Sequence, residues 1–123
     1  MILVDTSVWV DHFRRGDPTL EALLDRAGVL MHPFIVGELA LGRLDDRELI
    51  LGLLDNLPQA IVADHREVLD IVDRHRLSGT GIGYVDAHLV AATFLTPDAR
   101  LWTRDRRLNA VCSRLGIATN DGG

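Results

Sequence analysis

Four of the 18 acidic residues stand in positions where a carboxylate could do chemistry. Asp5 ends a short apolar run that is typical of a buried strand, and Asp105 lies just beyond another such run. Glu38 is the only charged residue in an apolar helical segment, and Asp86 opens a second such segment. Open parallel α/β sheets bind their ligands outside the carboxyl ends of the strands. A fold of that kind could bring these carboxylates to one edge.

Each of these carboxylates also has an ordinary structural explanation. Asp5 and Asp86 could cap the helices that follow them, and Asp105 could offset a helix dipole in a first turn capped by Thr103. Glu38 has apolar neighbours three and four positions away on its helix, so we expect its side chain to point at least partly inward. There it could pair with an arginine at the edge of the core. Taken singly, the four residues leave both explanations open.

Taken together, the four carboxylates predict a metal site. Held close, they would repel one another and raise one another's pKa values unless a cation offset their charge. Oxygen ligands without cysteine or paired histidine suit Mg²⁺, with Mn²⁺ as a substitute, rather than zinc. Carboxylates around one or two such ions are typical of phosphodiester hydrolysis. We therefore expect a metal-dependent hydrolase with Asp5, Glu38, Asp86 and Asp105 as metal ligands and catalytic residues.

Short strands alternate with helices along the chain. This alternation predicts one α/β domain over residues 1–123, with a mostly parallel central sheet flanked by helices. The last four residues, 120–123, are expected to fray. The helix that Asp86 opens is almost wholly apolar and should be buried. The expected strands are residues 2–5, 29–31, 60–62, 100–103 and 116–119, and the expected helices are residues 7–14, 17–28, 34–42, 45–57, 64–75, 86–95 and 104–114.

Composition excludes several classes of protein. The chain has 123 residues, 47% of them hydrophobic, which suits a single core. The net charge of −5 argues against a protein that coats nucleic acid by bulk charge but not against a metal nuclease.

Residue counts exclude further classes. All 13 basic residues are arginine, which argues against a P-loop ATPase or a receiver domain because both need a lysine. One cysteine, Cys112, excludes an intrachain disulfide. No apolar run approaches a membrane span and no basic leader precedes the first strand, so we expect a cytoplasmic protein.

Four short motifs carry a resemblance to a known family. They are Val4-Asp5-Thr6-Ser7, Gly37-Glu38-Leu39, the segment Asp-Ala-His-Leu-Val-Ala-Ala-Thr at residues 86–93, and Thr-Arg-Asp-Arg-Arg-Leu at residues 103–108. In order and spacing the chain resembles the PIN-domain nucleases, in particular the VapC-type toxins of toxin–antitoxin systems. The resemblance implies a PIN-like (Rossmann-like) three-layer α/β fold. Leu108 stands where an aromatic residue is common, and we expect only a packing difference there.

The resemblance also implies a mechanism and partners. Asp5, Glu38, Asp86 and Asp105 would form the acidic cluster of a Mg²⁺-dependent endoribonuclease. Thr6 and Thr103 would support it, with Thr6 rather than Ser7 facing the site. The protein would form a homodimer and would be neutralised by a cognate VapB-like antitoxin. The antitoxin's tail would lie in a groove beside the site. The candidate lining residues are Trp9, Leu20 and Leu49, although any one of them taken singly fits an ordinary core residue better.

Arginine side chains could contact RNA locally even though the net charge of the protein is negative. The planar guanidinium binds phosphate well, so a basic rim could hold RNA beside an acidic pit. The same residues could be ordinary solvated helix faces. The five histidines show no spacing typical of metal ligands, and we assign none of them to the site. The candidate RNA contacts are Arg14, Arg15, Arg104, Arg106 and Arg107.

Three alternatives are weaker. A phosphatase-like hydrolase with Asp5 as nucleophile would need a second aspartate at position 7, which is Ser7. A dinucleotide-binding loop would need glycine where Tyr84 follows Gly79, Gly81 and Gly83. A PIN-like protein that only binds a partner would be favoured by a missing carboxylate, and none of the four is missing.

Overall fold

The computed structural model describes residues 1–119, so the tail at 120–123 lies outside the described residues. Its centre is a parallel sheet in the order β2-β1-β3, formed by β1 (Ile2–Val4), β2 (Val29–Leu30) and β3 (Arg100–Trp102). Leu3 lies opposite Leu30 on one side and opposite Leu101 on the other. The predicted α/β fold with a mostly parallel central sheet is confirmed.

Two of the predicted strands are wrong as strands. Among the described residues each segment is associated with one isolated parallel bridge: Gln59, just before residues 60–62, pairs with Met31, and Ala118, within residues 116–119, pairs with Leu101. In the first segment the Ile61 N–H donates to the Thr96 hydroxyl, 2.9 Å away, so no neighbouring strand receives it. In the second segment, the backbone hydrogen bonds to the sheet go to one residue of β3. The Leu101 N–H donates to the Ile117 carbonyl, and the Leu101 carbonyl accepts the Thr119 N–H.

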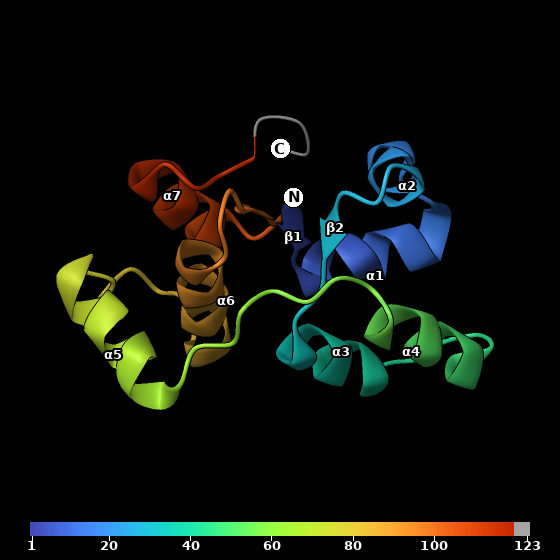
Figure 1. Cartoon of the computed structure of the whole chain (residues 1–123), viewed down its shortest axis with the longest axis horizontal. Coiled ribbons are helices and arrows are strands. Elements are labelled where there is room, and N and C mark those ends of the chain that lie inside the picture. The colour runs from blue at the N-terminus through green and yellow to red at the C-terminus, as the bar shows by residue number, and fades with distance from the viewer. Residues whose placement is uncertain (120–123) are drawn as a thin grey trace.

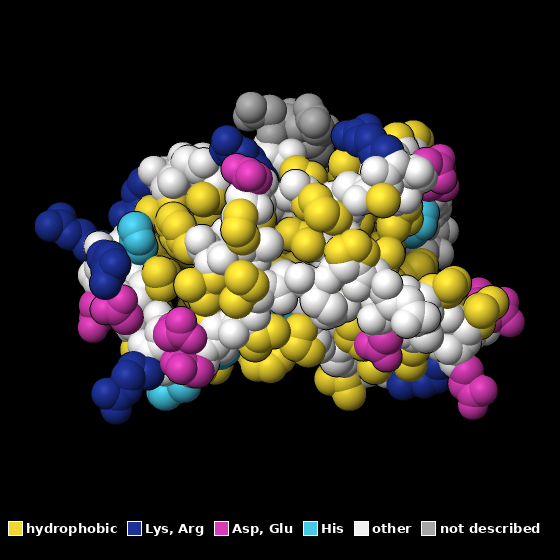
Figure 2. All heavy atoms as spheres, in the orientation of Figure 1, with side chains coloured by type: hydrophobic (Ala, Val, Ile, Leu, Met, Phe, Trp, Pro, Cys, Tyr) yellow, Lys and Arg dark blue, Asp and Glu magenta, His cyan; other side chains and the backbone are white. Residues whose placement is uncertain are grey.

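Helices lie on both sides of the strands. In Figure 1, α5, α6 and α7 lie to the left of β1 and β2, α1, α2 and α4 lie to the right, and α3 lies below. The sheet therefore separates two groups of helices, as the predicted layered fold requires. Figure 2, in the same orientation, shows hydrophobic side chains spread over this face among charged ones. The helices are α1 (Thr6–Arg15), α2 (Pro18–Asp25), α3 (Pro33–Ala40), α4 (Arg47–Asp55), α5 (His65–Arg74), α6 (Tyr84–Leu95) and α7 (Arg106–Leu115).

Side-chain caps set several helix starts. Asp17 accepts a hydrogen bond from the Leu20 N–H at 2.9 Å and so begins α2. Asp64 and Glu67 form a capping box at the start of α5. The predicted start of α6 at Asp86 is wrong by one half-turn, because the helix begins at Tyr84 with Gly83 as its cap residue. Asp86 therefore stands in the first turn.

The core packs the sheet against α6. Residues 87–93 of this helix are all buried, as its apolar sequence predicts. Leu3 in β1, Leu101 in β3 and Leu89 in α6 have no exposed surface. Such burial contributes roughly 1.5–3 kcal/mol for each large aliphatic side chain, so the helix that carries Asp86 is held firmly. In the part of the chain that the structure describes, no helix is long and apolar enough to cross a membrane.

Candidate active site

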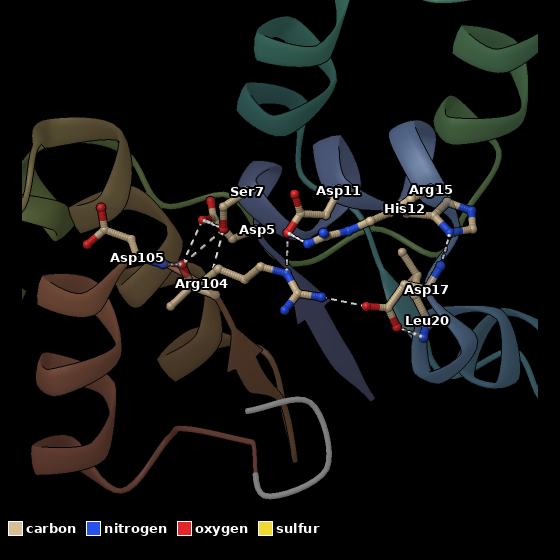
Figure 3. A network of polar contacts seen from close by, with 10 residues as sticks. Asp5, Ser7, Asp11, His12, Arg15, Asp17, Leu20, Arg104 and Asp105 are labelled. Atoms are coloured by element: carbon tan, nitrogen blue, oxygen red, sulfur yellow. Dashed lines mark hydrogen bonds and ion pairs between the residues drawn. The ribbon is translucent and has the colours of Figure 1, made fainter.

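Asp5 lies at the carboxyl end of the central strand and is 7% exposed. It occupies the cap position of α1, but its side chain makes no capping hydrogen bond. Its Oδ2 instead accepts hydrogen bonds from the Ser7 hydroxyl and the Thr103 hydroxyl, each at 2.7 Å. Figure 3 shows Ser7 beside Asp5. Capping therefore does not explain this carboxylate.

Ser7 is the residue that sequence reasoning missed. Its hydroxyl donates to Asp5 and accepts the Arg104 N–H at 3.0 Å, so it links the start of α1 to the turn after β3. The Thr6 hydroxyl donates to Glu38 Oε1 at 2.7 Å and not to the Asp5 carboxylate. The spacing alone could have indicated Ser7, because a hydroxyl two residues after an aspartate can reach its carboxylate.

Glu38 is exposed, so the prediction that it points inward is wrong. The core-facing residues of α3 are Ile35 and Leu39, which are 0% and 3% exposed. The outer face of this region is apolar too, since Leu41 is 91% exposed, and apolar neighbours therefore did not mark the buried face. The expected alternative, an ion pair with arginine, is also absent from the described residues.

Asp105 itself caps α7. Its Oδ1 accepts the Leu108 N–H at 2.9 Å, so the prediction that Thr103 is the cap is wrong. Thr103 lies between two of the candidate carboxylates: it donates to Asp5 and accepts the Asp105 N–H at 3.0 Å. One hydroxyl thus ties the ends of β1 and β3 to the first turn of α7.

The other three candidate carboxylates act electrostatically on Asp86. Burial is the largest cause of a raised pKa at Asp86, and the negative charges of Asp5, Asp105 and Glu38 raise that pKa further. The hydrogen bond that Asp86 accepts from the Gly83 N–H lowers the pKa and only partly opposes them. The side chains of Asp5, Glu38 and Asp105 are therefore close enough to Asp86 to raise the cost of ionising it.

The donor set fits a hard divalent cation by its chemistry. Within residues 1–119, no three acidic, histidine or cysteine side chains lie together as a ready metal site. Each of the four carboxylates, however, accepts hydrogen bonds from described residues on only one oxygen: Asp5 Oδ2, Glu38 Oε1, Asp86 Oδ2 and Asp105 Oδ1. The second oxygen of each is available, and carboxylate oxygens are the ligands that Mg²⁺ prefers.

The candidate arginines differ in their surroundings. Arg104 pairs with Asp11 at 2.8 Å and Asp17 at 2.5 Å, and Figure 3 shows it reaching between these two carboxylates. Arg15 also pairs with Asp11, at 3.6 Å. Arg104 thus fastens the end of β3 to α1 and to the cap of α2. Three others make no ion pair with any described residue, namely Arg14, Arg106 and Arg107.

Comparison with known families matches residues 2–113 to the PIN domain. The chain belongs to the PIN-domain family. This PIN domain is 52% identical over 120 residues to Ribonuclease VapC32 of Mycobacterium tuberculosis, in strains CDC 1551 / Oshkosh and ATCC 25618 / H37Rv. The alignment covers 96% of this chain and 95% of each relative. The resemblance to VapC-type PIN domains that the four motifs carry is confirmed.

The predicted groove residues of this PIN domain divide between core and surface. Leu20 has no exposed surface and belongs to the core, so its place in the groove is wrong. Leu49 is 62% exposed on α4. Trp9 is 2% exposed and its Nε1 donates to the Val4 carbonyl, yet its side chain also lines an apolar cavity of about 260 Å³ with α4 residues such as Leu53. Trp9 is thus both a core residue and part of a cavity wall.

Proposed function

We propose that this PIN domain is a Mg²⁺-dependent endoribonuclease that acts in the cytoplasm as the toxin of a type II toxin–antitoxin module. The observation that carries the proposal is that Asp5, at the carboxyl end of the central strand, acts together with Glu38 and Asp105 to raise the pKa of Asp86, while one oxygen of each carboxylate accepts no hydrogen bond from a described residue. The name of the relative, a ribonuclease, supports RNA as the substrate.

In this proposal Asp5 and Asp86 are the principal metal ligands, and Glu38 and Asp105 complete the cluster. When bound, the cation supplies Lewis acidity for water and for the phosphodiester. Thr103 and Ser7 hold Asp5 in place and thereby fix the direction of its available oxygen. Thr6 does the same for Glu38.

The positively charged surface for RNA would come from arginines that other residues leave unpaired. Arg106 and Arg107 line a cavity of about 540 Å³ beside α7, together with Thr80 and Arg114. An unpaired guanidinium can bind a phosphate without first giving up an ion pair. Arg104, held by two aspartates, has a structural role instead.

The partners follow from the family. A VapB-like antitoxin would neutralise the protein, and its tail would use the apolar cavity beside Trp9. The protein would act as a homodimer. Among the described residues no observation favours the non-catalytic or phosphatase-like alternatives over cleavage of RNA.

The proposed function is tested by incubating the pure protein with total RNA and Mg²⁺ and mapping the new ends by sequencing. We expect cleavage that EDTA abolishes and Mn²⁺ restores. Asp5→Asn and Asp86→Asn should each prevent cleavage and also relieve growth inhibition when the protein is expressed without an antitoxin. Cleavage that persists in EDTA would overturn the metal mechanism, and full toxicity of either variant would overturn the assigned site.

A further inference from the structure

Another cavity lies between α1, α3 and the loop that follows α3. Its volume is about 460 Å³, and Glu38 forms part of its wall. Pockets of roughly 300–1,000 Å³ take small organic ligands. Because Glu38 is one of the proposed metal ligands, a group bound in this cavity would contact a residue of the proposed site.

The walls of this cavity combine apolar surface with positive charge. Phe13 and Leu39 supply apolar surface, and Arg14 and Arg43 supply two cations. Neither arginine forms an ion pair with a described residue. An aromatic or apolar wall beside free guanidinium groups suits a ligand that has a flat ring and a phosphate.

Phe13 gives the cavity a rigid aromatic wall. It is 37% exposed and stacks on the buried Trp9, with ring centroids 5.8 Å apart and an interplanar angle of 29°. Support from Trp9 holds one face of the ring, so the exposed part of the side chain is pre-organised to receive a second ring. Aromatic side chains of this kind stack unpaired bases without regard to their sequence.

The opposite wall is also preformed. It comes from the loop between α3 and α4, which includes Gly42, Arg43 and Leu44. Arg47 holds this loop by donating hydrogen bonds to the carbonyls of Ala40 and Gly42. The cavity therefore does not depend on a ligand to form it.

The neighbouring apolar cavity is chemically different. It shares Phe13 and is otherwise lined by Trp9, His12 and aliphatic residues of α2, α4 and the segment after α4, with no arginine or carboxylate. Such a surface suits an apolar peptide segment. The cavity that holds Glu38, Arg14 and Arg43 is the one whose charges complement RNA.

We propose that this cavity is a subsite for one unpaired nucleotide of the RNA, adjacent to the phosphodiester that is cut. The base stacks on Phe13, and Arg14 and Arg43 bind the phosphates on either side of it. The inference rests on the proposed ribonuclease function and adds a requirement: the substrate must be single-stranded at this nucleotide, and its base contributes to binding.

The test uses a short single-stranded oligoribonucleotide in which each position in turn is made abasic. Binding is measured by fluorescence anisotropy in the Asp5→Asn background, where the proposed function predicts no cleavage. One abasic position should weaken binding by about tenfold. In Asp5→Asn combined with Phe13→Leu, which keeps an apolar side chain on Trp9, that position should lose its effect. Phe13→Trp should retain it.

Matched controls separate the subsite from general effects. Phe34→Leu changes an aromatic side chain of equal exposure outside the cavity and should leave the abasic profile unchanged. Arg43→Gln should weaken binding of every oligonucleotide and reduce its salt dependence, whereas Arg66→Gln on α5 should do neither.

Two outcomes would overturn the subsite. One is a flat abasic profile, or one that Phe13→Leu does not alter. The other is a Phe13→Leu variant that binds RNA normally but loses affinity for an antitoxin peptide, which would assign the cavity to protein. Failure of the proposed function gives a different result, since the protein with Asp5 intact would then not cleave RNA in Mg²⁺.

Discussion

Thr103 and Asp5, 98 residues apart in the chain, are joined by a 2.7 Å hydrogen bond from the threonine hydroxyl to Oδ2 of the carboxylate. The register of the sheet explains this contact. Val4 in β1 lies opposite Trp102 in β3, so the next residue of each strand emerges beside the other at the carboxyl end. The Asp5 N–H also donates to the Trp102 carbonyl at 2.9 Å. The sheet thus positions the central carboxylate directly.

Replacing Thr103 with valine removes this hydroxyl while keeping the shape of the side chain. Asp5 would then be held by Ser7 alone, and we expect RNA cleavage to fall by about 10- to 100-fold, as for other residues that orient a metal ligand. Steady-state kinetics of a fluorescent oligoribonucleotide would measure the change.

Thr93→Val is the matched control, because Thr93 is also buried and its hydroxyl donates only to the Leu89 carbonyl in its own helix. We expect this variant to lose some thermal stability and to keep its activity. Equal losses of activity in the two variants would mean that Thr103 matters only for packing.

Arg104 should behave as a structural residue. Because its guanidinium joins Asp11 and Asp17, Arg104→Gln should lower the free energy of unfolding by about 1 kcal/mol. The salt dependence of RNA binding should stay the same, since Arg104 is already paired. Urea denaturation and binding titrations at several salt concentrations would measure the two quantities.

The contrasting variant is Arg106→Gln combined with Arg107→Gln. It should leave stability nearly unchanged and make RNA binding less dependent on salt. If Arg104→Gln instead reduced the salt dependence as strongly as this double variant, Arg104 would have to be counted among the residues that contact RNA.

We expect the Asp86 carboxylate to lower the stability of the metal-free protein at neutral pH while being required for activity. Its raised pKa means that the folded protein holds this proton more tightly than the unfolded chain does. Stability therefore falls as the pH rises from the ordinary value of 3.8 through the folded pKa, and at pH 7 the ionised carboxylate is destabilising. Without metal, Asp86→Asn should have a higher Tm than the wild type at pH 7 and should be inactive.

Added Mg²⁺ provides the second half of this test. It should raise the Tm of the wild type, because a cation offsets the repulsion around Asp86, and should raise that of Asp86→Asn less. Differential scanning fluorimetry with and without EDTA would show both effects. A wild type that melts at a higher temperature than Asp86→Asn in EDTA at pH 7 would argue against repulsion at this edge.

His32 should give the protein an acid-sensitive component of stability. Burial, and then the charge of His88, lowers the pKa of His32 from 6.5 to about 4. The unfolded chain takes up a proton there before the folded protein does, so stability decreases as the pH falls from 6.5 towards 4. His32→Asn removes this titration, and an asparagine can still accept the Phe34 N–H that caps α3.

The measurement is Tm against pH for the wild type and His32→Asn. The variant should show a shallower decline between pH 6.5 and 4, whatever its absolute Tm. Parallel curves would mean that His32 does not contribute to the acid sensitivity.

Local patterns in the sequence predicted the strands and helices that carry the site. Strand-then-helix alternation predicted the parallel sheet, and the apolar segment after Asp86 predicted the buried helix α6. The caps at Asp17 and Asp64 were visible for the same reason, because a cap and its partner lie within four residues of one another.

The errors came from contacts that no local pattern encodes. Arg104 meets Asp11 and Asp17 only after β3 has been placed beside β1. Phe34, one turn before Glu38 on α3, is itself 36% exposed, so apolar neighbours could not identify the buried face of this helix. The strand expected at 60–62 does not form because the Ile61 N–H turns to the Thr96 hydroxyl, and the one expected at 116–119 keeps a single bridge to Leu101.

Binding of a divalent cation by Asp5, Glu38, Asp86 and Asp105 can be measured by calorimetric titration of Mn²⁺ into the metal-free protein at pH 7. We expect saturable binding to the wild type and little or none to Asp5→Asn or Asp86→Asn, with circular dichroism showing that both variants are folded. No binding to the wild type, or equal binding to folded Asp5→Asn and Asp86→Asn, would mean that these carboxylates do not form a metal site.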